Sequence, residues 1–116
     1  MAKGAWDAQV INQIAPQGDE IVLAKTSSSV FIPTNIDYVL RNLGVKQLVI
    51  SGVITDQCVE SAIRDACDPG YLVTRVSDAC LTYSAQRHAQ SLRTIQGYCR
   101  QVTTQQLVAE IANIRS

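Results

Sequence analysis

Short apolar runs alternate with helical patterns along this 116-residue chain, and that alternation restricts its fold more than any other feature. The runs predict strands over residues 20–24, 46–52, 71–76 and 100–104. The intervening segments have helical spacing and predict helices over 34–44, 56–68, 84–97 and 104–115. Strands that alternate with helices indicate an α/β fold with a largely parallel sheet. The length fits a single domain over residues 1–116.

The charge balance excludes several classes of partner. Ten Lys and Arg residues offset ten Asp and Glu residues, so no excess charge attracts nucleic acid or an acidic membrane surface. The apolar runs are much shorter than the roughly 20 residues of a membrane span. The first ten residues lack the apolar core of a signal peptide. We therefore expect a cytoplasmic chain that binds neither nucleic acid nor membrane.

The four cysteines, Cys58, Cys67, Cys80 and Cys99, form no C-x-x-C pair and no Cys/His cluster with metal-ligand spacing. We expect neither a metal nor another cofactor, and we interpret all four as thiols. Cys67, Cys80 and Cys99 are predicted to be packing residues. The single histidine, His88, lies on a polar helical segment and is predicted to be a surface residue.

Cys58 stands where the apolar run 46–52 turns into a polar helix. Sites in open parallel sheets lie outside the carboxyl ends of the strands, and Lys25 directly follows the run 20–24. Right-handed crossovers would bring both residues to one sheet edge. There a helix N-terminus and a cation would stabilise a thiolate that can attack a carbonyl and form a thioester.

Simpler interpretations of the same residues stay open. Cys58 could be a small packing residue, and Lys25 could be solvated. Asp56 is most simply a helix N-cap, whose charge would oppose a thiolate at Cys58.

Several motifs together give a more specific indication. "AKTSSSVF" (24–31) has a lysine before a loop with serines and a phenylalanine. "LVISGVITDQCVESAIRDACDPGYLVTRVSDA" (48–79) contains G-x-x-T-[DN]-x-C-V, R-D-A, G-Y-x-V and D-A in that order. "GAWDAQV" and "PQGDEIV" precede the lysine. This pattern closely resembles the isochorismatase-like cysteine hydrolases, over essentially the whole chain.

The resemblance implies roles for individual residues. Cys58 would be the nucleophile and Lys25 its cationic partner. A cis peptide would join Val53 and Ile54, and the backbone N–H groups of Ile54 and Cys58 would form the oxyanion hole. No metal is implied, because the metal-binding residues of related nicotinamidases belong to a part of the pattern upstream of residue 1.

The chain also departs from the family pattern, whose triad contains an Asp well upstream of the lysine. Asp7 belongs to another segment of the pattern and is a poor substitute. The resemblance implies a Rossmann-like, three-layer parallel sheet of order 3-2-1-4-5-6, N-terminally truncated here to strands 3 to 6. Two strand edges would then be open, which favours a homo-oligomer. Alternatively, residues 20–24 would pair directly with 46–51, displacing Lys25 by about 10 Å.

Within the family, the segments around Lys25 most resemble the ureidoacrylate and N-carbamoyl amidohydrolase branch. The expected activity is hydrolysis of a C–N bond in a small amide or carbamoyl compound through a Cys58 thioester. One alternative is hydrolysis of a vinyl ether, as in isochorismatases. The other is a truncated remnant without catalytic activity.

Overall fold

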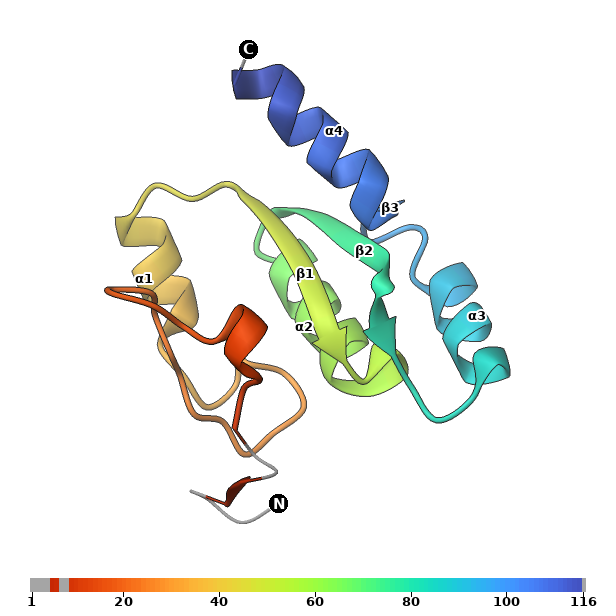
Figure 1. Ribbon diagram of the computed structural model, residues 1–116, viewed down its shortest axis with the longest axis horizontal. Coiled ribbons are helices and arrows are strands. Elements are labelled where there is room, and N and C mark those ends of the chain that lie inside the picture. Colours follow the sequence, from red (N-terminus) through yellow and green to blue (C-terminus); the bar gives the residue numbers. More distant parts are fainter. Residues whose placement is uncertain (1–4, 7–8, 116) are drawn as a thin grey trace.

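A computed structural model describes residues 5–6 and 9–115 and contains a three-stranded parallel sheet (Figure 1). Its strands are β1 (Gln47–Val53), β2 (Leu72–Leu81) and β3 (Arg100–Val102), in the order β1-β2-β3. β2 pairs in parallel with both neighbours. The predicted α/β fold with a parallel sheet is therefore confirmed.

The helices follow the sequence pattern with small shifts at their ends. They are α1 (Ile36–Asn42), α2 (Glu60–Cys67), α3 (Ala85–Thr94) and α4 (Thr104–Arg115). A five-residue π-helical turn, η3 (Thr55–Val59), leads into α2, and a short 3-10 turn, η2, spans Asn12–Ile14. Ser84 caps α3, because its hydroxyl accepts a hydrogen bond from the Arg87 N–H at 3.2 Å. No helix in the described part of the chain is long and apolar enough to span a bilayer.

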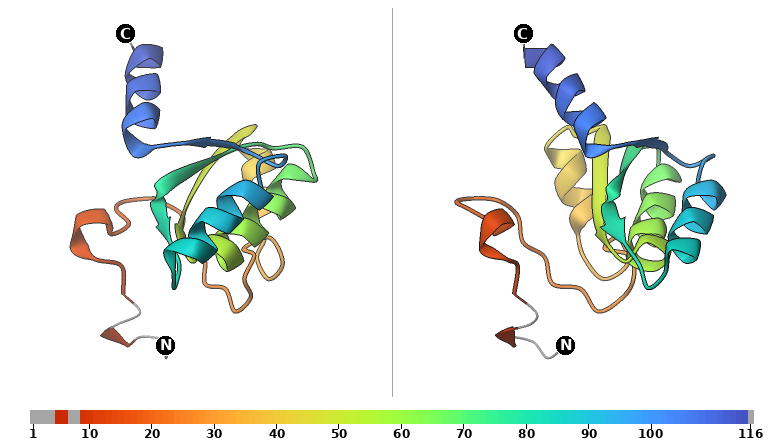
Figure 2. Two further views of the ribbon diagram at one scale, coloured as in Figure 1. Left: turned by 90° about the vertical axis from the view of Figure 1, so that its right-hand side faces the viewer. Right: turned by 45° about the vertical axis from the view of Figure 1, so that its right-hand side comes forward.

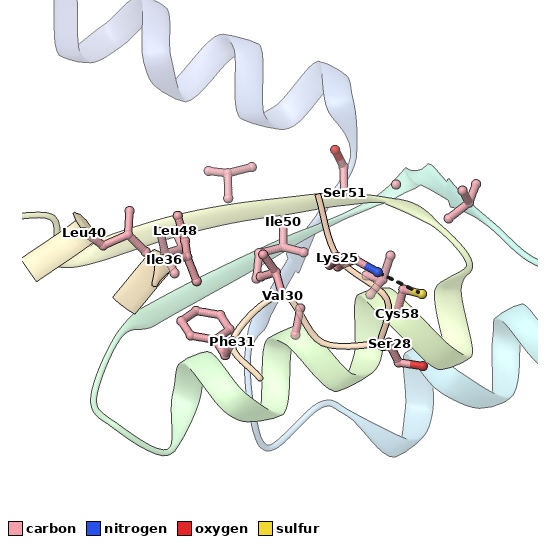
Figure 3. A pocket seen from close by; sticks show the side chains of 15 residues that line it. Lys25, Ser28, Val30, Phe31, Ile36, Leu40, Leu48, Ile50, Ser51 and Cys58 are labelled. Carbon is pink, nitrogen blue, oxygen red and sulfur yellow. Dashed lines mark hydrogen bonds between the residues drawn. The ribbon is translucent and has the colours of Figure 1, made fainter. Parts of the chain in front are cut away.

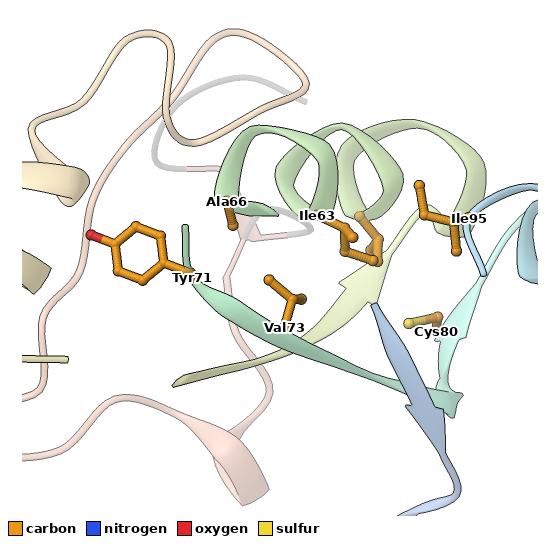
Figure 4. Close-up of a cluster of buried hydrophobic side chains, with 7 residues drawn as sticks. Ile63, Ala66, Tyr71, Val73, Cys80 and Ile95 are labelled. Atoms are coloured by element: carbon orange, nitrogen blue, oxygen red, sulfur yellow. The ribbon is translucent and has the colours of Figure 1, made fainter. Parts of the chain in front are cut away.

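Helices α2 and α3 cover one face of the sheet (Figure 2). The core between these layers brings together residues of η3, α2, β2 and the end of α3 (Figure 4). Its members are Val59, Ile63, Ala66, Tyr71, Val73, Cys80 and Ile95. Cys80 is thus a packing residue as predicted, and Cys99 packs against the same cluster. Burial of this apolar surface is the main force that holds α2 on the sheet.

The predicted strand over residues 20–24 is wrong. This segment is irregular, and Ile21 and Val22 are 54% and 69% exposed. An apolar run becomes a strand only when another strand satisfies its backbone groups, and β1 has β2 as its single partner among the described residues. Direct pairing of 20–24 with β1 does not occur.

Both edges and one face of the sheet remain open in the described chain, because β1 and β3 each pair with β2 alone. β2 pairs with one edge of β1 and leaves the other edge unpaired. On the face away from α2 and α3, Val49, Val53, Leu72 and Leu81 are each more than half exposed. Helix α4 projects away from the sheet, and the Thr104 N–H donates a hydrogen bond to Asp78 Oδ1 at 2.8 Å (Figure 2).

Candidate active site

Lys25 and Cys58 come together although Lys25 does not end a strand. Lys25 Nζ lies 3.6 Å from Cys58 Sγ and also donates a hydrogen bond to the Ser27 carbonyl at 2.8 Å (Figure 3). The loop around them is folded by its own serines. Ser27 Oγ donates to the Ser29 carbonyl at 2.8 Å, and buried Ser29 Oγ accepts from the Phe31 N–H at 3.2 Å. Local side-chain hydrogen bonds, and not the predicted strand, therefore fix the loop that carries Lys25.

Cys58 is carried by η3, directly after β1. Gly52 has a φ of 128°, a region that favours glycine, and lies beside an irregularity in the pairing of β1 with β2. The Val53–Ile54 peptide bond is cis. The Ile54 carbonyl then accepts hydrogen bonds from the N–H groups of Gln57 and Val59, both at 3.2 Å. The chain therefore reverses between strand and helix so that Cys58 lies half-buried at the carboxyl end of β1.

Asp56 has a different role from the predicted N-cap. Its carboxylate accepts hydrogen bonds from Thr82 Oγ1 and Arg87 Nε, each at 2.7 Å. The hydrogen bond from Thr82, followed by that from Arg87, lowers the pKa of Asp56. The negative charge two residues before Cys58 is thus paired with a guanidinium, which reduces its opposition to a thiolate.

His88 is not the unpartnered surface residue that the sequence suggested. It is half-buried, and its Nδ1 lies 2.8 Å from the hydroxyl of Thr55, the fully buried first residue of η3.

Sequence reasoning also missed Arg75, which is fully buried on β2. A charged residue inside the predicted strand 71–76 was the available signal, because a buried guanidinium requires several acceptors.

The Lys25–Cys58 pair stands at one end of an open cavity of about 360 Å³. Ser28 lies near this polar end, as Figure 3 shows. The remaining wall is largely apolar and comes from the loop, α1, β1, η3 and α2; its side chains include Val30, Phe31, Ile36, Leu40, Leu48 and Ile50. The described lining residues include no carboxylate. Asp7, the poor substitute for the family's acid, lies outside the described residues.

In the same part of the chain, no group of three or more His, Cys, Asp or Glu side chains is arranged to hold a metal ion. A cation, a thiol and an apolar chamber can accommodate a small uncharged or anionic carbonyl compound, with its reactive carbon against the sulfur.

Comparison with known proteins gives a consistent result. The family model described as "Isochorismatase domain" matches residues 1–106. The ureidoacrylate amidohydrolase RutB of Rhizobium rhizogenes is 32% identical over 114 residues, which cover 89% of this chain and 46% of that protein. The chain thus spans less than half the length of this curated relative.

Solved structures agree with this match. The isochorismatase-like hydrolase of Alkaliphilus metalliredigens superposes with a TM-score of 0.88 at 30% identity, covering 93% of this chain and 59% of that one. The pyrazinamidase/nicotinamidase of Streptococcus mutans has a TM-score of 0.64 at 31% identity and covers 67% and 44%. Together with the ordered motifs around Lys25 and Cys58, these matches show that the chain belongs to the isochorismatase family of hydrolases.

Proposed function

We propose that the chain hydrolyses a C–N bond in a small amide or carbamoyl compound, with Cys58 as nucleophile and Lys25 as its cationic partner. The observation that carries this proposal is the 3.6 Å contact between Lys25 Nζ and Cys58 Sγ at the polar end of the cavity. In this pair an ammonium group contacts a sulfur atom beside an open cavity. A nearby cation stabilises a thiolate, and the open cavity makes it accessible to a substrate.

The proposed reaction has two steps. The Cys58 thiolate adds to the carbonyl carbon, the C–N bond breaks, and the leaving nitrogen takes a proton, for which the Lys25 ammonium is the nearest donor. Water then adds to the thioester and gives one proton to the neutral Lys25 amine, the C–S bond breaks, and the thiolate and the Lys25 ammonium are restored with release of a carboxylic or carbamic acid. The N–H groups of Ile54 and Cys58 are proposed to bind the oxyanion in both steps.

The relatives support amide chemistry over other reactions of the fold. The name of the Rhizobium rhizogenes protein specifies an amidohydrolase that acts on ureidoacrylate, and that of the Streptococcus mutans structure specifies an amidase for pyrazinamide and nicotinamide. Because the chain spans less than half of each of these proteins, we propose only the substrate class, small amides and carbamoyl compounds, and no individual substrate.

The proposal includes a setting for the enzyme. Residues 1–116 would form a single domain that works as a homo-oligomer in the cytoplasm. Four free cysteines fit a reducing compartment. The open edge of β1 and the exposed apolar residues beside it favour association of copies.

The test is ammonia or amine release from a panel of ureido, carbamoyl and simple amide compounds, combined with mass spectrometry of acid-quenched enzyme. We expect an acyl adduct on the Cys58 peptide, and we expect Cys58→Ser to abolish both adduct and turnover. Cys67→Ser is the matched control, since Cys67 is also a half-buried thiol and lies outside the cavity wall. Turnover that survives Cys58→Ser would overturn the proposal.

The absence of a carboxylate from the described cavity lining favours one other outcome, a chain without catalytic activity. Such a chain would give no turnover on the panel while remaining folded. Vinyl-ether cleavage that survives Cys58→Ala would instead assign the isochorismatase reaction, which does not require the thiol.

A further inference from the structure

Beyond the Lys25–Cys58 pair, helix α3 contacts the Cys58 turn at successive residues. His88 Nδ1 meets the Thr55 hydroxyl at 2.8 Å, and the preceding residue, Arg87, donates from Nε to Asp56 at 2.7 Å. Two neighbouring side chains of α3 thus hold the first two residues of η3. Cys58 follows two residues later in the same turn.

The third contact of α3 lies one helical turn further on. Ser91 Oγ is 2.8 Å from Glu60 Oε1 and 3.4 Å from the Thr55 carbonyl. A hydroxyl has one hydrogen to donate, and the shorter distance assigns it to the Glu60 carboxylate. Ser91 therefore holds the start of α2, directly after η3.

Arg75 supports these contacts from inside the fold. Its guanidinium donates to Gln101 Oε1 from Nε and Nη2, at 3.0 and 2.7 Å, and to Ser91 Oγ and the Ser91 carbonyl at 3.0 and 3.1 Å. Its remaining hydrogen bond reaches the Thr55 carbonyl at 3.4 Å. All five N–H donors have acceptors, as a fully buried charge requires. Ser91 and Thr55 are thus fixed by a rigid buried group.

The two ends of η3 are held and its middle is accessible. Thr55 is 0% and Val59 3% exposed, and Val59 packs in the apolar core. Cys58 lies between them and is only half-buried. The direction of the thiol is set by how firmly the ends are fixed, because a five-residue turn has few other restraints.

We infer that His88 and Arg87 are positioning residues: through Thr55 and Asp56 they hold η3 in the orientation that brings the Cys58 thiol to Lys25. This inference rests on the proposed role of Cys58 as the nucleophile. It assigns to α3 a function in the site although the cavity wall contains no residue of α3.

Two measurements on the full chain test this. The first is amide hydrogen exchange in the peptide that contains η3, and the second is the rate of iodoacetamide labelling of Cys58 relative to Cys67. For His88→Ala we expect faster exchange in η3 and about fivefold slower labelling of Cys58, the change that loss of one net hydrogen bond corresponds to. Gln86→Ala is the control, since Gln86 is exposed on the same helix.

Conservative variants separate positioning from general stability. His88→Asn keeps a polar atom near the Nδ1 position and should restore most of the labelling rate. Thr55→Val removes the hydroxyl at nearly constant volume, and its effect should not add to that of His88→Ala, because both remove the same bond. Arg87→Met should slow Cys58 labelling independently. If one of these variants fails to fold, the remaining variants still test whether α3 positions η3.

Unchanged hydrogen exchange of η3 in His88→Ala would overturn the inference. Faster exchange of η3 with an unchanged rate of Cys58 labelling would also overturn it, because the contact would then be purely structural. A different result tests the proposed function. If Cys58 of the unmodified chain labels no faster than Cys67, the nucleophile assignment fails, and the exchange data decide separately whether α3 holds η3.

Discussion

Lys25 is the residue whose removal tests the Cys58 site most directly. Its ammonium lies 3.6 Å from the sulfur, and in the proposed reaction it is the cationic partner of the Cys58 nucleophile. We expect Lys25→Met to slow iodoacetamide labelling of Cys58 at pH 7 by about threefold, the effect of an exposed charge pair. The control is Lys46→Met, because Lys46 is exposed and lies outside the cavity wall. Equal labelling in both variants would show that Lys25 does not act on the thiol.

The four thiols should differ in reactivity because of burial. Burial raises the pKa of Cys80 and of Cys99, so both remain neutral thiols in the folded chain through the neutral range. The stability that their neutral forms contribute is present below the ordinary thiol value of about 8.5 and is lost as pH rises through the raised folded values. In timed alkylation at pH 8 we expect Cys58 first and Cys80 and Cys99 last. Early labelling of Cys80 would show that the core opens.

Single residues also show what sequence reasoning could and could not predict. The ordered motifs singled out Lys25 and Cys58, which the structure brings within contact. The resemblance to the isochorismatase-like hydrolases also implied a Val53–Ile54 cis bond, which is present. His88 was misinterpreted because its partner, Thr55, is 33 positions away and no periodicity relates the two. Long-range hydrogen bonds between single side chains leave no local pattern in a sequence.

At the scale of elements, hydrogen bonds of Asp37 and Arg41 join α1 to the body of the fold, beside the packing of Leu40 on the core. Asp37 Oδ1 accepts a hydrogen bond from Tyr71 Oη at 2.7 Å, and Arg41 Nε contacts both carboxylate oxygens at 3.1 Å. Arg41 also donates to the Pro69 carbonyl at 3.3 Å. The same short helix supplies Ile36 and Leu40 to the cavity wall, so this contact helps to shape the site.

This contact should respond to acid. The hydrogen bond from Tyr71, followed by that from Arg41, lowers the pKa of Asp37. A lowered carboxyl pKa contributes stability above the unfolded value of about 3.9, and the contribution is lost as pH falls through the lower folded value. We expect Asp37→Asn to lower the urea midpoint at pH 7, and the difference from the unmodified chain to shrink below pH 4. Asp19→Asn, at an exposed loop position, should show neither effect.

The elements also explain the limits of pattern reading. Helices α1 to α4 and strands β1 to β3 were all anticipated from their apolar spacing, which for α2, β1 and β2 reflects contact with one core. Residues 20–24 have an equally apolar run but pair with no strand in the described chain. Composition indicates what a segment could form, whereas the presence of a hydrogen-bonding neighbour decides whether a strand forms.

For the whole molecule, the open face of the sheet predicts association. Leu72 and Leu81 are 67% and 68% exposed on the face that α2 and α3 leave uncovered, and Val53, the partner of Leu81 in β1, is 65% exposed. Several exposed apolar side chains beside an unpaired strand edge favour association of copies. Light scattering should therefore detect a dimer or larger assembly at micromolar concentration.

A paired substitution identifies the surface responsible. Leu72→Lys with Leu81→Lys places two charges on the open face and should shift the protein toward the monomer, because a buried unpaired charge opposes association. Leu43→Lys is the matched control, since Leu43 is 65% exposed at the end of α1 and lies outside the sheet. A monomeric unmodified chain would contradict the prediction outright. An assembly that tolerates both sheet charges would place the interface elsewhere, with the unpaired edge of β1 as the next surface to block.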